Sequence, residues 1–402
     1  MTTRLPDAEP AFDPDACAVC GGDEAAIAFE RHAPSFASDG RVIDEPIVKV
    51  ECLACGAVRR GTPFDADALA RHYHDDYALG RRAAATEPIF FDKGRATPRS
   101  LAMFDWLSSE VCRCGNLSPR AFAEIGCGDG AVLVRFRTMW PAARAVGLEW
   151  NRADADAARN RGLDVHCAPY GALSGMFDVI YAVAVIEHVP SPAHFLAALR
   201  AQLTANGLLL IAYPALDVGS RDLLFVDHLH HLGDAHLAHL GAAAGLATVR
   251  SAPGTGPLAA FRLHVFRRVE TIGPPNGVPL RPSVSSRATF DRWQRRFARL
   301  DEWLAALDRP PIVWGLGEGF GLLSAYSGLS ACRIELGLDD NPTRFAGDVL
   351  PFPVCSLEDA SDDALRDARV LLTFSCTPAV ARRLEHRSLP WFDAMSEAVY
   401  EC

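Results

Sequence analysis

The stretch that decides the fold is "RAFAEIGCGDGAVLVRF", residues 120–136. Its first part, "AFAEIGC", has the apolar content of a buried strand, and "AVLVRFRTMW" (131–140) is typical of a helix. Between them, Gly126, Gly128 and Gly130 predict a tight turn. Glycine lets a ligand approach the backbone closely, and the start of a helix offers free N–H groups. The pattern therefore predicts a ligand site at the carboxyl end of the strand.

The segments that follow continue this alternation of strand and helix. A helix is expected at "SPAHFLAALRAQL" (191–203). Further strands are expected at "ARAVGLEW" (143–150), "GLDVHCAP" (162–169), "FDVIYAVAVIEHV" (177–189), "NGLLLIAYP" (206–214), "LATVRSAPG" (246–254) and "PLAAFRLHVFRRV" (257–269). Alternating strands and helices predict an α/β fold with a doubly wound sheet.

Length and composition restrict the alternatives. The chain has 402 residues, of which 49% are apolar and 22% charged, so two or three globular domains are expected. Its formal charge of −10 argues against a nucleic-acid partner. No run approaches the roughly 18 apolar residues of a membrane span, and the first residues lack the apolar segment of a signal peptide. We therefore expect a cytoplasmic protein with reduced thiols and no membrane partner.

Two cysteine pairs near the start have metal-ligand spacing. Cys17 and Cys20 form "CAVC", Cys52 and Cys55 form "CLAC", and each pair is followed by glycine. Four thiolates suit a closed, tetrahedral and therefore structural Zn²⁺ site in a small zinc ribbon. The alternatives are two unrelated thiol pairs or a redox pair.

The last third of the chain repeats the strand–turn–helix pattern. It follows a Pro/Gly-rich linker at residues 270–284 and an amphipathic helix at residues 285–308. "PPIVWGLGEGFGLLSAYSGL" (310–329) and "CRIELGLDDNP" (332–342) then predict a second, smaller Rossmann-like unit.

On "EIGCGDG", "GLEW" and "FDVIYAVAVIEHV", residues 118–268 resemble class I S-adenosylmethionine-dependent methyltransferases. The resemblance implies that Glu124 helps to hold the methionine part, that Glu149 binds the ribose, and that residues 168–170 flank the adenine. The cofactor contacts implied are Glu124, Gly126, Gly128, Asp129, Gly130, Glu149, Ala168, Pro169 and Ala182. The alternative, an NAD-binding unit, prefers a GxGxxG spacing in place of the GxGxG found here.

Taken whole, the chain resembles the three-domain nucleotide-sugar C-methyltransferases of deoxysugar biosynthesis. The resemblance rests on the two CxxC pairs, "EIGCGDG", "IEHV", "DHLHHL" and "VWGLGEGFG…DDNP". It implies a zinc-binding ribbon with a connecting helix (11–80), a cofactor-binding core (81–268) and a Rossmann-like substrate-binding domain (269–402). In the last of these, Gly315, Gly317 and Asp340 are the candidate substrate contacts.

The stretch "DHLHHLGDAHLAHL" (227–240) holds five of the thirteen histidines. Asp227 and His228 occupy the place of a Glu-His pair in that family, in a loop expected at the carboxyl edge of the sheet. A neutral imidazole beside a carboxylate suits a general base near pH 7, so His228 is the candidate base. A metal site and a histidine bonded to a backbone carbonyl are the alternatives. His230 and His231 contact the substrate or pack.

Three further residues are candidates for catalysis. Glu187 and His188 end a strand at the same edge, where they organise the cofactor side or take part in the chemistry. The resemblance implies that Tyr77 lines the sugar site; otherwise it is a packing aromatic. Two departures from the family concern the substrate, because Asp227 replaces Glu and Ala184 stands where a histidine is usual.

The sequence thus predicts a methyltransferase that uses S-adenosylmethionine and methylates a small molecule, a keto-deoxysugar nucleotide, on carbon through an enolate. The alternatives are an O- or N-methyltransferase of another secondary metabolite and a non-catalytic binding protein. The sequence is compatible with a monomer and does not fix the oligomeric state.

Overall fold

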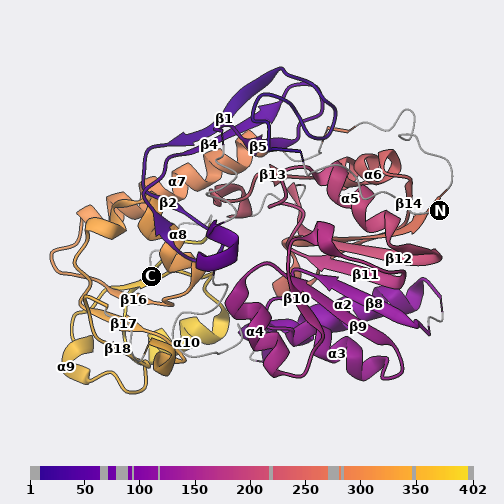
Figure 1. Cartoon of the computed structure of the whole chain (residues 1–402). Coiled ribbons are helices and arrows are strands. Elements are labelled where there is room, and N and C mark those ends of the chain that lie inside the picture. The colour runs from indigo at the N-terminus through magenta and orange to yellow at the C-terminus, as the bar shows by residue number, and fades with distance from the viewer. Residues whose placement is uncertain are drawn as a thin grey trace.

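The computed structural model describes residues 10–63, 71–77, 89–92, 95–115, 118–216, 221–269, 280–281, 285–345 and 350–396. Figure 1 shows an N-terminal module along one side of two α/β units, one central and one C-terminal. Among the described residues, no helix has the length and apolar character needed to cross a membrane.

The N-terminal module is built on a small antiparallel sheet. Its described strands are β1 (Ala25–Arg31), β4 (Ile47–Cys52), β5 (Val58–Arg60) and the short hairpin of β2 (Ser35–Phe36) and β3 (Val42–Ile43). The strand β13 (His230–His231), from far along the chain, pairs with β5. The sequence placed His230 and His231 in a loop, and this is corrected here, because the backbone of both residues completes the edge of the ribbon sheet.

The central unit contains the predicted doubly wound sheet. Within the described residues its order is β10 (Val165–Cys167), β9 (Arg144–Glu149), β8 (Ala121–Ile125), β11 (Phe177–Val183), β12 (Leu203–Pro214), β15 (Phe261–Arg268) and β14 (Leu246–Pro253). The first five strands are parallel, and β15 runs antiparallel to both of its neighbours. Every residue of β8 is buried, as expected for a strand covered on both faces. The mixed α/β fold predicted for the core is confirmed.

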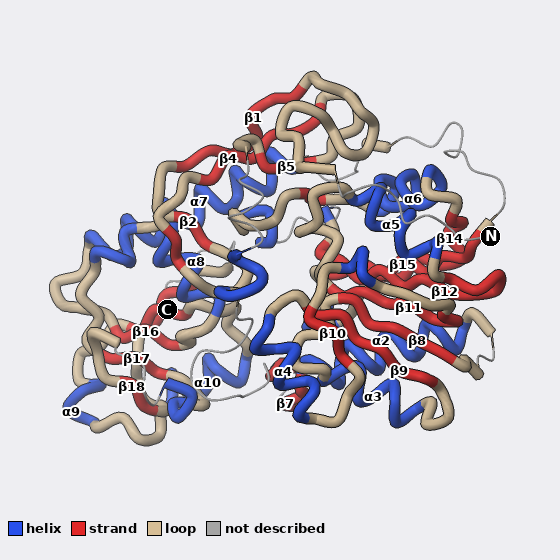
Figure 2. Tube along the Cα trace, viewed as in Figure 1, coloured by secondary structure: helices blue, strands red, loops and turns tan. Residues whose placement is uncertain are grey.

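Helices cover both faces of this sheet, as Figure 2 shows. On one face lie α2 (Arg99–Arg113), α3 (Ala131–Met139) and α4 (Arg152–Asn160), which share one buried cluster. On the other lie α5 (Pro192–Ala201) and α6 (Asp234–Ala243). The hairpin of β6 (Ile89–Asp92) and β7 (Arg95–Pro98) leads into α2.

The C-terminal unit is a second parallel sheet, as predicted. Its described strands follow the order β18 (Val354–Cys355), β17 (Leu336–Leu338), β16 (Ile312–Trp314), β19 (Val370–Leu372) and β20 (Trp391–Asp393). Its described α-helices are α7 (Ser286–Ala305), α8 (Glu318–Tyr326), α9 (Asp362–Leu365) and α10 (Pro378–His386).

The N-terminal module and the C-terminal unit share one hydrophobic core. Phe29 of β1 stacks on Phe290 of α7 with ring centroids 4.8 Å apart. Gly321 of α8 lies against the ring of Phe36, where a Cβ atom would come within 2.4 Å of the ring. The ribbon is therefore packed against the C-terminal unit, and Leu223, Leu224, Phe225 and Val226 lie in the same cluster.

Candidate active site

The glycine turn after β8 keeps one position open. All three glycines have positive φ, +68° at Gly126, +53° at Gly128 and +78° at Gly130. A Cβ atom on Gly126 would lie 2.6 Å from Val185, and one on Gly130 would lie 2.2 Å from Leu163, whereas one on Gly128 would meet nothing within 4 Å. Packing explains the first and third glycines. Of the three, only Gly128 has open space where a side chain would begin, so a ligand can come close to its backbone there.

Glu149 stands beside that open position at the end of β9. Its carboxylate accepts hydrogen bonds from the backbone N–H of Gly128 and of Asn151, both at 2.7 Å. Burial raises its pKa despite these backbone donors. The N–H of Ala168 donates to the Glu149 carbonyl at 3.1 Å, so the predicted adenine-flanking segment, with the exposed Pro169, starts next to this carboxylate. A carboxylate in this position can accept hydrogen bonds from the two hydroxyls of a ribose.

The other predicted cofactor contacts have structural partners. Glu124 is buried under the turn, where the Tyr181 hydroxyl donates to it at 3.0 Å. Asp129 accepts from the N–H of Ala131 at 3.1 Å and forms an ion pair with Arg161. Ala182 is buried in β11 opposite Ile125 of β8. Their contact with a cofactor remains a prediction.

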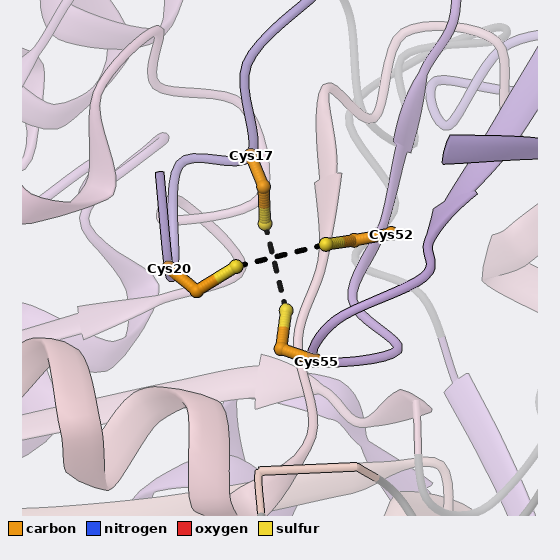
Figure 3. Close-up of side chains that lie close together, drawn as sticks. All are labelled: Cys17, Cys20, Cys52 and Cys55. Carbon is orange, nitrogen blue, oxygen red and sulfur yellow. Dashed lines mark hydrogen bonds between the residues drawn. The ribbon is translucent and has the colours of Figure 1, made fainter. Parts of the chain in front are cut away.

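The four predicted metal ligands converge. Figure 3 shows the sulfur atoms of Cys17, Cys20, Cys52 and Cys55 pointing toward one another. The Sγ atoms of Cys17 and Cys55 lie 3.6 Å apart, as do those of Cys20 and Cys52. Four thiolates about 2.3 Å from one zinc ion are about 3.8 Å apart in a tetrahedron. The cluster therefore fits a zinc ribbon.

Near Tyr77, the tyrosine that contacts His188 through its hydroxyl is Tyr73. A π-helical turn, His72–Asp76, precedes Tyr77, and the Asn151 side chain donates to the carbonyls of Tyr77 at 2.7 Å and Tyr73 at 3.3 Å. This fixes the turn next to the end of β9. The Tyr73 hydroxyl then lies 2.5 Å from Nδ1 of His188, while the Tyr77 ring is 6.3 Å from the His188 ring. Sequence reasoning missed Tyr73, although its spacing of four residues from Tyr77 puts both on one side of a helical turn.

Glu187 and His188 follow a strained turn after β11. Ala184 adopts a left-handed conformation with φ +54°, a strain that clusters at functional sites. Neither carboxylate oxygen of Glu187, which is buried, has a hydrogen-bond partner among the described residues. Burial raises the pKa of Glu187 to about 7 and lowers the pKa of His188 to about 3. The pair is therefore an uncharged imidazole beside a carboxyl group that is half-protonated near neutral pH.

His228 lies at the centre of a buried cluster of rings. Its ring centroid is 4.6 Å from that of His188 and 5.0 Å from that of Phe225, with nearly perpendicular planes. Nδ1 is buried without a hydrogen-bond partner in the described part of the chain. The backbone carbonyl of His228 accepts from Nζ of the fully buried Lys49 at 2.7 Å.

The carboxylate next to His228 in sequence turns away from it. Asp227 accepts from the N–H and the hydroxyl of Ser38, at 2.8 and 2.6 Å. The carboxylate near Nδ1 of His228 is that of Asp222, at 3.8 Å. Sequence reasoning missed Asp222, because it lies six residues earlier and only the fold brings it back.

His230 and His231 face different neighbours. His230 Nε2 is 3.2 Å from the Pro190 carbonyl, and its ring meets Phe12 edge-on at 5.5 Å. His231 Nδ1 is 3.0 Å from the Asp222 carboxylate. His236 lies in α6. Its Nδ1 accepts from the N–H of Gly233 at 2.9 Å, and its Nε2 lies 3.0 Å from the Cys55 carbonyl.

The glycine turn of the C-terminal unit is filled. A Cβ atom on Gly315 would lie 2.5 Å from the Phe374 ring, and Gly317 begins α8. The carboxylate in the position of Glu149 is Asp339, whose oxygens accept from the N–H of Leu316 and Asn341 at 3.3 and 2.9 Å. Asp340, the predicted substrate contact, forms an ion pair with Arg383, and its contact with a substrate stays a prediction.

Known proteins match the central part of the chain. Residues 102–251 match the family model of a methyltransferase domain. The ubiquinone biosynthesis O-methyltransferase of Parvibaculum lavamentivorans is 35% identical over 98 residues, 23% of this chain and 39% of that protein. The trans-aconitate 2-methyltransferase of Deinococcus radiodurans is 30% identical over 95 residues, 23% of this chain and 37% of that protein. The chain thus spans less than half the length of these relatives.

Solved structures give weaker likenesses. The mitomycin 7-O-methyltransferase MmcR aligns with a TM-score of 0.34 and 20% identity over 40% of this chain and 53% of its own. The plantazolicin methyltransferase BpumL, in complex with SAH, aligns with a TM-score of 0.37 and 15% identity over 42% of this chain and 84% of its own. At such TM-scores these likenesses carry no argument, and the family match stands on its own.

Proposed function

We propose that the chain is an S-adenosylmethionine-dependent methyltransferase that methylates a carbon next to the keto group of a nucleotide-linked deoxysugar. One observation carries the proposal: a buried imidazole, His228, packs beside the Tyr73–His188 pair next to the open glycine turn. The two sites adjoin because Gly126 lies against Val185, three residues before His188. The family match of residues 102–251 supports the cofactor.

The cofactor would lie across Gly128 and Glu149. Gly128 leaves room at the backbone, and the Glu149 carboxylate can exchange its bonds with backbone N–H groups for bonds from the ribose hydroxyls. S-adenosylmethionine supplies a methyl group on a positively charged sulfur, so the substrate carbon beside it must be made electron-rich.

His228 would make this substrate carbon electron-rich by removing its proton. It accepts the proton from the carbon next to the keto group, and the electron pair moves into the enolate. The enolate carbon bonds to the methyl group as the carbon–sulfur bond breaks, and the proton then leaves His228 for solvent. The Tyr73 hydroxyl, 2.5 Å from Nδ1 of His188, would donate to the developing oxygen, and it stays protonated because burial raises its pKa well above the usual value. Tyr77, which follows the same turn, would be a second donor.

Zinc bound by the four cysteines would have a structural role in this proposal. The metal would hold the knuckle that contains Cys55, whose carbonyl faces His236. It would also hold β5, on which β13 pairs two residues after His228. Zinc would thus stabilise the segment that carries the base.

Calorimetric titration with S-adenosylmethionine tests the cofactor first, and absence of binding would refute every methyltransferase activity proposed for the chain. Turnover of a 4-keto-6-deoxyhexose nucleotide then tests the base. We expect His228→Gln to bind cofactor as the wild type does and to lose about 100-fold or more in turnover. The matched control is His239→Gln, on the half-buried side of α6. Equal turnover in both variants would remove His228 from the mechanism.

O-methylation is the second candidate, and the name of one relative favours it. That relative, an O-methyltransferase, is 35% identical over 98 residues. A buried base can deprotonate a hydroxyl as well as a carbon acid. The atom of the product that carries the new methyl group, oxygen or carbon, distinguishes the two reactions.

A further inference from the structure

One carboxylate oxygen of Asp222 lies near the imidazoles of both His228 and His231. It lies in the short 3-10 turn Arg221–Leu224 and is buried. Its Oδ2 is 3.0 Å from Nδ1 of His231 and 3.8 Å from Nδ1 of His228. Because Nδ1 of His228 is buried and has no hydrogen-bond partner among the described residues, Asp222 is the acceptor within closest reach of it.

We propose that Asp222 positions the base, by holding the proton of His228 on Nδ1 so that Nε2 carries the free electron pair that takes the substrate proton. This rests on the proposed function. A neutral imidazole has one donor nitrogen and one acceptor nitrogen, and its neighbours decide which is which. A carboxylate beside Nδ1 also stabilises the imidazolium that forms when Nε2 takes up a proton.

The two other acids near His228 are less suited to this role. Asp227 already accepts two hydrogen bonds from Ser38. Glu187 lies in the same cluster, but burial raises its pKa to about 7, so much of it is uncharged near neutral pH. Burial would raise the pKa of Asp222 too, but His228 and His231 more than offset this and hold it below its usual value. Asp222 therefore stays a carboxylate.

The C-terminal unit fixes the turn that carries Asp222. Arg221 forms an ion pair with Glu318 at the start of α8, and the Tyr326 hydroxyl at its end donates to the Leu224 carbonyl at 2.6 Å. The turn is thus held at both ends by one helix. The role of this unit then includes aligning the base as well as holding the substrate.

The same three side chains could instead bind a metal ion. One ligand atom from each of Asp222, His228 and His231 lies within 4.8 Å of the others. Lys49 also lies near Asp222, but burial lowers the pKa of its ammonium group to about 7, so its charge does not decide against a metal ion. The metal content of the protein decides the question.

The test compares Asp222→Asn with His231→Gln in the full chain. Imidazole ¹⁵N resonances, with that of His228 assigned by its loss in His228→Gln, report which nitrogen carries the proton. We expect Nδ1–H in the wild type and in His231→Gln, and a shift toward Nε2–H in Asp222→Asn. Deuterium uptake from D₂O into the 4-keto-6-deoxyhexose nucleotide should fall by about tenfold or more in Asp222→Asn only. An unchanged resonance, or equal loss in both variants, would overturn the proposal.

Two further measurements keep the outcome decisive. Tyr326→Phe keeps the Asp222 carboxylate but removes one hydrogen bond that holds its turn. We therefore expect a smaller shift of the His228 proton toward Nε2, and this variant serves as the test if Asp222→Asn folds poorly. Zinc analysis should give about one equivalent in the wild type and in Asp222→Asn; a second equivalent lost with Asp222 would make this a metal site and refute the proposal. The proposed function and the role of Asp222 fail in different experiments. If the protein is no methyltransferase, S-adenosylmethionine does not bind, while Asp222→Asn still moves the His228 proton from Nδ1 toward Nε2.

Discussion

Acid should destabilise this protein through the histidines buried around its site. Burial lowers the pKa of His188 and His231 to about 3 and of His230 to about 4, from an ordinary value of 6.5. Burial raises the pKa of Glu187 to about 7 from 4.5. Between pH 6.5 and 4.5, unfolding therefore adds one proton to each of three histidines and removes one from Glu187, a net uptake of about two protons.

The size and sign follow from linkage. A buried histidine with a lowered pKa is neutral in the folded protein. Its contribution to the free energy of unfolding is therefore complete above pH 6.5 and is lost as the pH falls. Each proton of difference changes the free energy of unfolding by about 1.4 kcal/mol per pH unit. Two protons give a loss of about 3 kcal/mol for each unit between pH 6 and pH 5. Urea unfolding followed by tryptophan fluorescence at these two pH values measures the difference.

Two substitutions sharpen this experiment in opposite directions. Glu187→Gln removes the opposing proton, so the loss should grow to about three protons, or 4 kcal/mol per unit. His188→Gln should reduce it to about one proton. His32→Gln, at an exposed position, is the matched control and should change nothing. A pH-independent free energy of unfolding, or a smaller loss in Glu187→Gln, would refute the reasoning.

Two other predictions concern the metal and the cofactor turn. Chelation of zinc should raise hydrogen exchange in residues 228–232 before that in β8, because β13 depends on β5; simultaneous exchange in both would contradict this coupling. Gly128→Ala should weaken S-adenosylmethionine binding more than tenfold. Gly115→Ala, just after α2, also places an alanine at a positive φ (+128°) with nothing within 4 Å of its Cβ atom, so it should leave affinity unchanged. Equal affinity in both variants would show that Gly128 does not face the cofactor.

The parts of the fold that the sequence predicts are those with strong local signals. The strand β8 is a continuous buried run followed by a glycine turn, and the five-stranded C-terminal sheet repeats that pattern. The strand β13 is two residues long and pairs with β5, about 170 residues earlier, so no alternation of apolar residues marks it.

The site is less predictable because it depends on pairings between distant residues. The cysteine cluster could be predicted from the spacing of its four residues, whereas the role of His228 rests on the family resemblance and stays a prediction. Asp222 and Tyr73 were missed, because neither lies beside its partner in the sequence and only the fold brings Asp222 to His228 and Tyr73 to His188. The choice between Asp339 and Asp340 depends on which of two adjacent side chains turns inward at the end of β17.

The attachment of the transferred methyl group tests the central claim most directly. The enzyme is incubated with a 4-keto-6-deoxyhexose nucleotide and S-adenosylmethionine labelled with ¹³C in the methyl group, and the product is followed by two-dimensional NMR. We predict a labelled methyl carbon bonded to the ring carbon next to the carbonyl, formed by the wild type and not by His228→Gln. A methoxy product, or the same C-methyl product in both proteins, would contradict the account.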